Sequence, residues 1–182
     1  MPFIDELLSY KNDYFVETGT YQGDTILRVA HNDVFSPPHI ISLELSDVFF
    51  NRCKKRIRNE PRITLYRANS KTDLYTVIKD IPSTITFWLD SHWSGVPDIG
   101  CDSETLCPLL YELEQIKRHP IKTHTIMIDD IRLMDNKHFP VTLPEIIKKL
   151  YEINPTYTLT FYDDNESKND ILVAHVNLIR VH

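Results

Sequence analysis

The sequence predicts an α/β fold with a doubly wound, mostly parallel sheet of seven strands that ends in an antiparallel C-terminal hairpin. Short apolar runs alternate with amphipathic helical segments five times along the chain, which is typical of βαβ units. The run at residues 84–89 (TITFWL) is dense in apolar and β-branched residues, as in a central strand covered on both faces. The last two runs, at residues 157–162 and 171–176, flank a polar turn and predict the hairpin.

Each element carries its own local signal. Apolar residues recur at three- and four-residue intervals in the expected helices, and β-branched or aromatic residues fill the expected strands. Ser46 is a typical N-cap, and Pro144 lies near the first turn of a later helix. The polar stretch at residues 96–103 is long enough to cross the top of the sheet as a lid. The expected elements are helices at 3–10, 24–31, 46–57, 71–79, 106–116 and 143–151, and strands at 14–16, 40–43, 63–67, 84–89, 123–128, 157–162 and 171–176.

Length and composition indicate a single globular domain over residues 1–182. The formal charge of -6 and the pI near 5.7 argue against a protein that binds nucleic acid mainly through its phosphates. No apolar run approaches the length of a membrane span. Cys53, Cys101 and Cys107 have no metal-ligand spacing, and their odd count gives no closed disulfide framework. We therefore expect a cytoplasmic protein that binds neither nucleic acid nor membrane.

The stretch YFVETGTYQGDT is organised as a strand, a glycine turn and a helix start. The strand at residues 14–16 is expected to break at Glu17, and a helix resumes after Gly23. Tyr21 stands where the dinucleotide fingerprint has its middle glycine, so a pyrophosphate could not approach closely and NAD is disfavoured. The Glu17 carboxylate would also repel phosphate, whereas it could pair with a cationic amino group.

Glu44 ends the next apolar run, about 20 residues beyond the glycine turn, where an acid typically takes the ribose hydroxyls. A glycine turn and a ribose acid without phosphate-binding features suggest S-adenosylmethionine. A plain tight turn is the alternative for the glycines alone. Asn69 follows the third expected strand, and its amide could bond an adenine edge or cap the next helix; a capping role applies equally to Ser70.

Three carboxylates follow the fourth and fifth expected strands. Asp90 comes directly after the apolar run at residues 84–89, and Asp129 and Asp130 follow the next strand. Because these carboxylates would repel one another at one sheet edge, a divalent cation, with magnesium as the first candidate, is the natural compensation. The alternative for the aspartate pair is a solvated turn or a helix cap. His92 could be a further ligand or a general base, and we favour the base.

Together these residues resemble the class I S-adenosylmethionine-dependent methyltransferases, and more narrowly the metal-dependent macrocin-type O-methyltransferases of sugar and antibiotic tailoring. The resemblance implies a Rossmann-like methyltransferase fold and a glycine loop that cradles the methionine part of the cofactor. It also implies Asp90, Asp129 and Asp130 as metal ligands. The family often has an acidic base where this chain has His92. The residues expected at the cofactor are Glu17, Gly19, Thr20, Gly23, Thr25, Glu44, Asn69, Ser70 and Asp90.

The expected activity is metal-assisted methyl transfer from S-adenosylmethionine to a hydroxyl of a small molecule, a sugar or other polyol, with His92 and Asp90 as catalytic residues. Three alternatives stay open from the sequence. They are N-methylation of an amino sugar, a metal-dependent hydrolase or nucleotidyl enzyme that uses the aspartates, and a non-catalytic cofactor-binding module. A homodimer is a further expectation.

Overall fold

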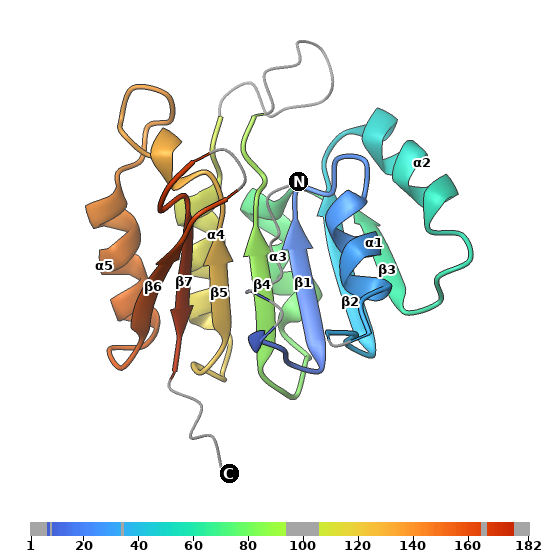
Figure 1. The fold of residues 1–182 in the computed structure, drawn as a ribbon, viewed down its shortest axis with the longest axis horizontal. Coiled ribbons are helices and arrows are strands. Elements are labelled where there is room, and N and C mark those ends of the chain that lie inside the picture. Colours follow the sequence, from blue (N-terminus) through green and yellow to red (C-terminus); the bar gives the residue numbers. More distant parts are fainter. Residues whose placement is uncertain (1–6, 8, 34, 94–105, 165–166, 177–182) are drawn as a thin grey trace.

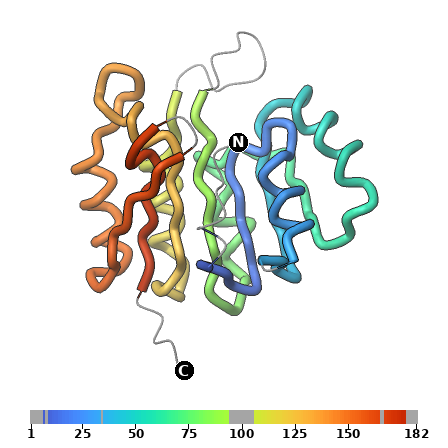
Figure 2. The backbone as a smooth tube through the Cα atoms, viewed as in Figure 1, coloured from blue at the N-terminus to red at the C-terminus, as the bar shows by residue number. Residues whose placement is uncertain are grey.

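The computed structural model describes residues 7, 9–33, 35–93, 106–164 and 167–176, and it confirms the predicted fold class. The described strands form one seven-stranded sheet in the order β3-β2-β1-β4-β5-β7-β6 (Figure 1). Strands β1 to β5 are parallel, whereas β7 runs antiparallel between β5 and β6 (Figure 1). Figure 2 traces the backbone in the same view, with the red C-terminal strands at one side of the sheet. The strands are β1 (Tyr14–Thr18), β2 (His39–Glu44), β3 (Ile63–Arg67), β4 (Ile85–Leu89), β5 (Thr125–Ile128), β6 (Thr158–Tyr162) and β7 (Ile171–His175).

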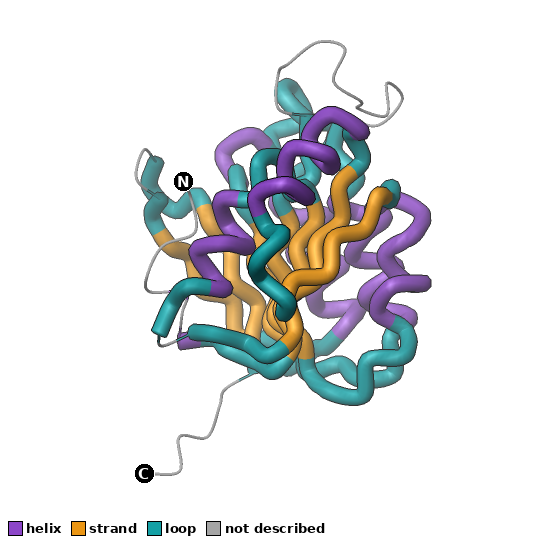
Figure 3. The backbone as a smooth tube through the Cα atoms, turned by 90° about the vertical axis from the view of Figure 1, so that its right-hand side faces the viewer, coloured by secondary structure: helices purple, strands orange, loops and turns teal. Residues whose placement is uncertain are grey.

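Helices cover both faces of the sheet (Figure 3). On one face, α3, α4 and α5 pack on a core that includes Phe87 and Leu113. On the other face, α1 and α2 pack on a core that includes Phe15 and Trp88. Phe87 and Trp88 are neighbours in β4 and lie in different cores, because successive strand side chains alternate between faces. The helices are α1 (Asp24–Ala30), α2 (Asp47–Arg56), α3 (Ser70–Ile78), α4 (Leu109–Arg118) and α5 (Leu143–Ile153), with the short 3-10 helix η2 at Ile131–Leu133.

Strand β1 extends two residues beyond its predicted end. The sequence analysis placed the break at Glu17, but Glu17 and Thr18 pair with Ser42 and Leu43 of β2 on one side and with Trp88 and Leu89 of β4 on the other. The polarity of Glu17 does not end the strand, because the Ser42 hydroxyl donates a hydrogen bond to its buried carboxyl.

Other boundaries differ by a few residues. Helix α4 begins at Leu109 rather than at residue 106, and β5 begins at Thr125 rather than at residue 123. Ser46 is the N-cap of α2, as predicted, and accepts a hydrogen bond from the Phe49 backbone N–H. Within the described residues, no helix is both long and apolar enough to cross a membrane. The expected helix at 3–10 falls largely outside the described residues, and the expected lid at 96–103 falls wholly outside them.

Candidate active site

The expected site residues gather at the carboxyl edge of the parallel strands. Residues Gly19, Glu44, Asn69, Asp90 and Asp129 follow or end β1, β2, β3, β4 and β5 respectively. The strand order reverses between β1 and β4, because β1 connects through α1 to β2 on one side while β4 leads to β5 on the other. Ligands of open α/β sheets bind in the crevice at such a switch point.

The glycine turn packs directly against the residue that follows β4. Gly19 has a φ of 84° and Gly23 a φ of 81°, conformations that glycine adopts readily. A Cβ on Gly19 would lie 2.2 Å from the backbone carbonyl oxygen of Asp90. Tyr21, between the two glycines, has a φ of 49°. The loop is therefore closely fitted to the strand that carries Asp90.

Glu17 and Thr20 belong to a buried hydroxyl–carboxyl network. Ser42 Oγ donates to Glu17 Oε2 at 2.5 Å, and Thr20 Oγ1 lies 2.6 Å from Ser42 Oγ. Burial raises the pKa of Glu17 well above its usual value, although the hydroxyls of Ser42 and Thr25 act to lower it. This network fixes the glycine turn to β2, so Glu17 has partners inside the protein, and its role toward a cofactor amino group stays a prediction.

Glu44 is oriented by two backbone N–H groups. Tyr21 N donates to Glu44 Oε2 at 2.7 Å, and Ser46 N donates to Glu44 Oε1 at 2.7 Å. Burial raises the pKa of Glu44, and these backbone hydrogen bonds partly offset the rise. Each carboxylate oxygen can accept a further hydrogen bond. The carboxyl that ends β2 is thus held beside the glycine turn, and its role toward a ribose diol stays a prediction.

Asn69 caps α3, which was one of its two sequence-based interpretations. Its side-chain oxygen accepts a hydrogen bond from the Lys71 backbone N–H at 3.0 Å. Asn69 N donates in turn to Asp73 Oδ2 at 2.9 Å. Ser70 Oγ donates to Ser91 Oγ at 3.2 Å and so connects the start of α3 to the segment after β4.

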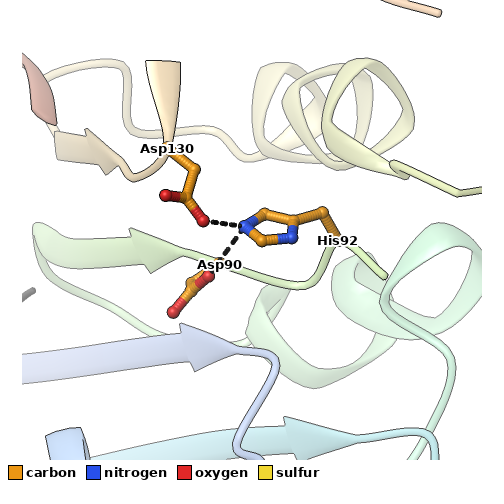
Figure 4. Close-up of side chains that lie close together, drawn as sticks. All are labelled: Asp90, His92 and Asp130. Carbon is orange, nitrogen blue, oxygen red and sulfur yellow. Dashed lines mark ion pairs between the residues drawn. The ribbon is translucent and has the colours of Figure 1, made fainter. Parts of the chain in front are cut away.

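Asp90, His92 and Asp130 converge on one point (Figure 4). His92 Nε2 lies 3.2 Å from Asp90 Oδ1 and 2.5 Å from Asp130 Oδ2. One ligand atom from each of the three residues falls within 4.8 Å of the others, so the group could hold a metal ion. The His92 ring also packs on the Phe139 ring, with a centroid distance of 5.0 Å. These side chains come from the ends of β4 and β5, as the sequence predicted.

The charges in this group shift one another strongly. Burial alone would lower the pKa of His92, but Asp130 and Asp90 outweigh it and raise the pKa to about 10. For Asp130 the effects are reversed: burial would raise its pKa, but His92 and Arg132 hold the pKa below its usual value. The metal-free group therefore places the positive charge of His92 against the Asp130 carboxylate, whereas burial raises the pKa of Asp90.

Asp129 lies beside this group but is not a member of it. Its side chain is 2% exposed, and its Oδ1 has no hydrogen-bond partner among the described residues. Burial, and then the charges of Asp90 and Asp130, raise its pKa to about 8. Because it lies in the electrostatic field of both carboxylates, Asp129 belongs to the charged surroundings of the site, and its role as a ligand stays a prediction.

The structure adds three charged residues that the sequence analysis did not single out. Arg132 and Asp170 contact the Asp130 segment, and Glu112 of α4 accepts a hydrogen bond from Ser91 Oγ at 2.5 Å. Glu112 had a usable signal, because it stands on the otherwise apolar face formed by Leu109, Leu113 and Ile116. Asp170 lies in a polar turn, and its sequence environment gives no such signal.

Solved structures share this fold at low sequence identity. An O-methyltransferase from Bacillus cereus in complex with SAH aligns with a TM-score of 0.63 and 13% identity, covering 94% of this chain and 77% of the other. TomG from Streptomyces achromogenes, an O-methyltransferase involved in tomaymycin synthesis and solved with SAM, gives 0.57 and 11%, covering 94% and 76%. The N-methyltransferase NodS from Bradyrhizobium japonicum gives 0.55 and 11%, covering 92% and 86%. No protein-family model and no curated protein sequence matches the chain.

These structural similarities show the class of fold to which the chain belongs. The described chain has the seven-stranded architecture of the class I methyltransferases, with the antiparallel strand β7 placed between β5 and β6. More particularly, it has the Rossmann-like methyltransferase fold that the sequence predicted. Because both O- and N-methyltransferases share this fold, the activity has to be argued from the site itself.

Proposed function

We propose that this chain is an S-adenosylmethionine-dependent, divalent-metal-assisted O-methyltransferase that acts on a hydroxyl of a small molecule, a sugar or other polyol. One observation carries the proposal: the glycine turn after β1 packs against Asp90, the first residue of the Asp90–His92–Asp130 group. A methyl donor bound at the turn and a proton-accepting group would then lie side by side at the switch point of the sheet.

The residues around the crevice fit the cofactor. Gly19 allows the turn to pack against the backbone of Asp90, at the carboxyl edge of the sheet, and the buried Glu44 carboxyl is oriented beside the turn with acceptor capacity to spare. Solved proteins of the same fold bind SAH or SAM, which supports the assignment. Tyr21, between the two glycines of the turn, weighs against a pyrophosphate ligand such as NAD.

The aspartates fit a divalent cation. Asp90 and Asp130 would hold it, beside the buried Asp129 carboxyl, whose pKa burial and those two charges raise to about 8. Asp129 Oδ1 has no hydrogen-bond partner among the described residues and could interact with such a cation. A divalent cation there would offset the negative charge that keeps His92 protonated and would lower the pKa of a nearby acceptor hydroxyl.

The chain's own residues then have two tasks. The sulfonium sulfur leaves as a neutral thioether without acid assistance, so the protein must align the acceptor oxygen with the S–CH₃ bond and remove the hydroxyl proton. As the new C–O bond forms and the S–C bond breaks, neutral His92 takes the proton at Nε2, the atom that faces Asp90 and Asp130.

Calorimetric titration of S-adenosylmethionine, with and without Mg²⁺ and with NAD as the comparison ligand, tests the cofactor assignment. We expect saturable binding of S-adenosylmethionine and none of NAD. Turnover with polyol acceptors should depend on the metal, and Asp130→Asn should lower it by about 100-fold or more, because both the ligand and the partner of His92 are lost. No binding of S-adenosylmethionine in either condition would refute the proposal.

A matched control is available within the chain. Asp135 and His138 form an exposed aspartate–histidine pair, with 3.0 Å between Oδ2 and Nδ1. Asp135→Asn removes the same kind of contact outside the site and should leave turnover unchanged. An equal loss of turnover in Asp130→Asn and Asp135→Asn would show that the effect is not specific to the proposed site.

A further inference from the structure

Asp170, the residue immediately before β7, is completely buried and contacts the segment that follows Asp130. Its backbone carbonyl accepts a hydrogen bond from Ile131 N at 2.9 Å, and its Oδ1 accepts one from Arg132 N at 2.9 Å. Its other oxygen, Oδ2, forms an ion pair with Arg132 Nη1. The C-terminal hairpin thus holds η2 through three contacts from one residue.

The same guanidinium nitrogen also contacts the proposed catalytic group. Arg132 Nη1 lies 2.6 Å from Asp130 Oδ1, while the other oxygen of Asp130 faces His92 Nε2. A continuous chain of opposite charges therefore runs from Asp170 through Arg132, Asp130 and His92 to Asp90. Each member of this chain has its orientation limited by the charges on either side.

Asp130 needs such support because of its backbone conformation. Its φ of 54° and ψ of 39° place it in the left-handed region, which is unfavourable for a residue with a Cβ. Surrounding contacts must hold a residue in this conformation. The hydrogen bonds from Ile131 N and Arg132 N to Asp170 lie immediately after Asp130 and provide that hold.

We propose that Asp170 is a positioning residue that acts through Arg132 to fix the Asp130 carboxylate, with Oδ1 toward Arg132 and Oδ2 toward His92. The inference rests on the proposed function only in taking Asp130 as part of the reacting group. If Asp170 is neutralised, the half-exposed Arg132 side chain loses its buried anchor, and Asp130 gains rotational freedom. A hairpin residue would thereby determine the geometry at the end of β5.

The test compares Asp170→Asn, Arg132→Gln and the double variant, observing the His92 ring nitrogens by NMR in the metal-free protein. Asparagine keeps the acceptor for Arg132 N and removes only the ion pair. We expect each single variant to move or broaden the His92 Nε2 resonance, and the double variant to add little, since the two residues act as one unit. An unchanged His92 signal in Asp170→Asn would overturn the proposal.

A second readout is the affinity for Mn²⁺, measured by electron paramagnetic resonance. Loss of one charged contact that orients a ligand should weaken Mn²⁺ binding about tenfold in both single variants. Arg132→Lys should bind Mn²⁺ more tightly than Arg132→Gln, because a single nitrogen of Arg132 contacts both Asp130 and Asp170 in the structure. Equal Mn²⁺ affinity in Asp170→Asn and the wild type would also overturn the proposal.

One control variant and two further outcomes separate this proposal from its alternatives. Asp164 accepts a hydrogen bond from Ser167 N in the same hairpin, so Asp164→Asn should alter loop stability without moving the His92 signal. If the wild type binds no Mn²⁺, the metal part of the proposed function fails, and the NMR comparison alone decides the role of Asp170. If Asp170→Asn does not fold, Arg132→Gln, at a half-exposed position, still tests the contact to Asp130.

Discussion

At Gly19 the backbone of the first strand comes closer to its neighbour than any other residue type would allow. The contact is with the backbone carbonyl of Asp90, which cannot move without displacing β4. Gly23 differs, because its closest neighbour would be the Cys53 side chain, with Sγ at 2.6 Å from a built Cβ. Two glycines of one turn therefore have different steric reasons for being glycine.

This difference gives a prediction for the two turn positions. Gly19→Ala should destabilise the protein by about 2 kcal/mol or more and weaken S-adenosylmethionine binding at least tenfold, since strain and a backbone clash add together. Urea unfolding and calorimetric titration measure the two effects. Cys53→Ala should recover part of the stability lost in Gly23→Ala and none of that lost in Gly19→Ala. Equal recovery in both would contradict the steric argument.

Residue types at strand ends could be predicted, but their directions could not. Asp90 and Asp130 were expected to meet because the carboxyl ends of neighbouring parallel strands share an edge, and the structure brings them together. Asp129 was expected in the same set and lies outside the group. Neighbouring residues at a strand end point to opposite sides, and the left-handed turn at Asp130 decides which one faces His92.

Among the elements, α4 contributes more to the site than a covering helix usually does. Glu112 is 1% exposed and accepts the Ser91 hydrogen bond. Burial raises its pKa, and the nearby hydroxyls of Ser70, Ser91 and Thr18 lower it. Ser91 lies between Asp90 and His92, so its hydrogen bond to α4 anchors the segment that carries two members of the Asp90–His92–Asp130 group.

We expect Ser91→Ala and Glu112→Leu each to lower the free energy of unfolding by about 1 to 3 kcal/mol, because each leaves the other member of this hydrogen bond without its partner. The double variant should cost less than the sum of the two, since both remove the same hydrogen bond. Urea denaturation of all four proteins gives the coupling energy. Strict additivity would show that the two residues contribute independently.

The sequence predicted the type and order of the described elements better than their ends. Helix α4 starts three residues later than expected and β1 ends two residues later. Periodicity identifies which face of a helix is buried, but it does not show whether a polar residue such as Glu17 finds a buried partner. That partner, Ser42, lies on another strand, and short-range patterns contain no information about it.

Over the whole molecule, the two edges of the sheet differ in character. The carboxyl edge carries the charged group, whereas the amino edge carries a buried pair of histidines. His124 Nε2 lies 3.0 Å from His119 Nδ1, and His124 Nδ1 accepts a hydrogen bond from Ile85 N. Both side chains are completely buried. Burial, and then the charges of His119 and Lys122, lower the pKa of His124 to about 3.

The lowered pKa of His124 predicts how the free energy of unfolding depends on pH. Because the folded-state pKa of His124 is depressed, its contribution is complete above the unfolded value of about 6.5 and is lost as pH falls toward about 3. The slope from this group can reach about 1.4 kcal/mol per pH unit. Urea unfolding at several pH values should show a smaller slope in His124→Gln than in the wild type. The exposed His138→Gln is the control and should match the wild type.

The hairpin was predicted as a pair of strands, but its contribution to the site was not. Asp170 and Asp130 are far apart in sequence, and only the antiparallel insertion of β7 beside β5 brings their segments together. Such a contact depends on topology and on register. A single sequence specifies neither at the precision of individual side chains.

The position of β7 also bears on the order in which the protein can assemble during synthesis. Strand β6 leaves the ribosome before β7, yet among the described strands its only partner is β7. One edge of β5 likewise stays unpaired until β7 (Ile171–His175) forms. A nascent chain that ends before β7 would expose an unpaired apolar edge, which favours aggregation or chaperone binding. When the hairpin has left the ribosome, pairing of β7 would cover that edge and, in the same step, bring Asp170 to Arg132.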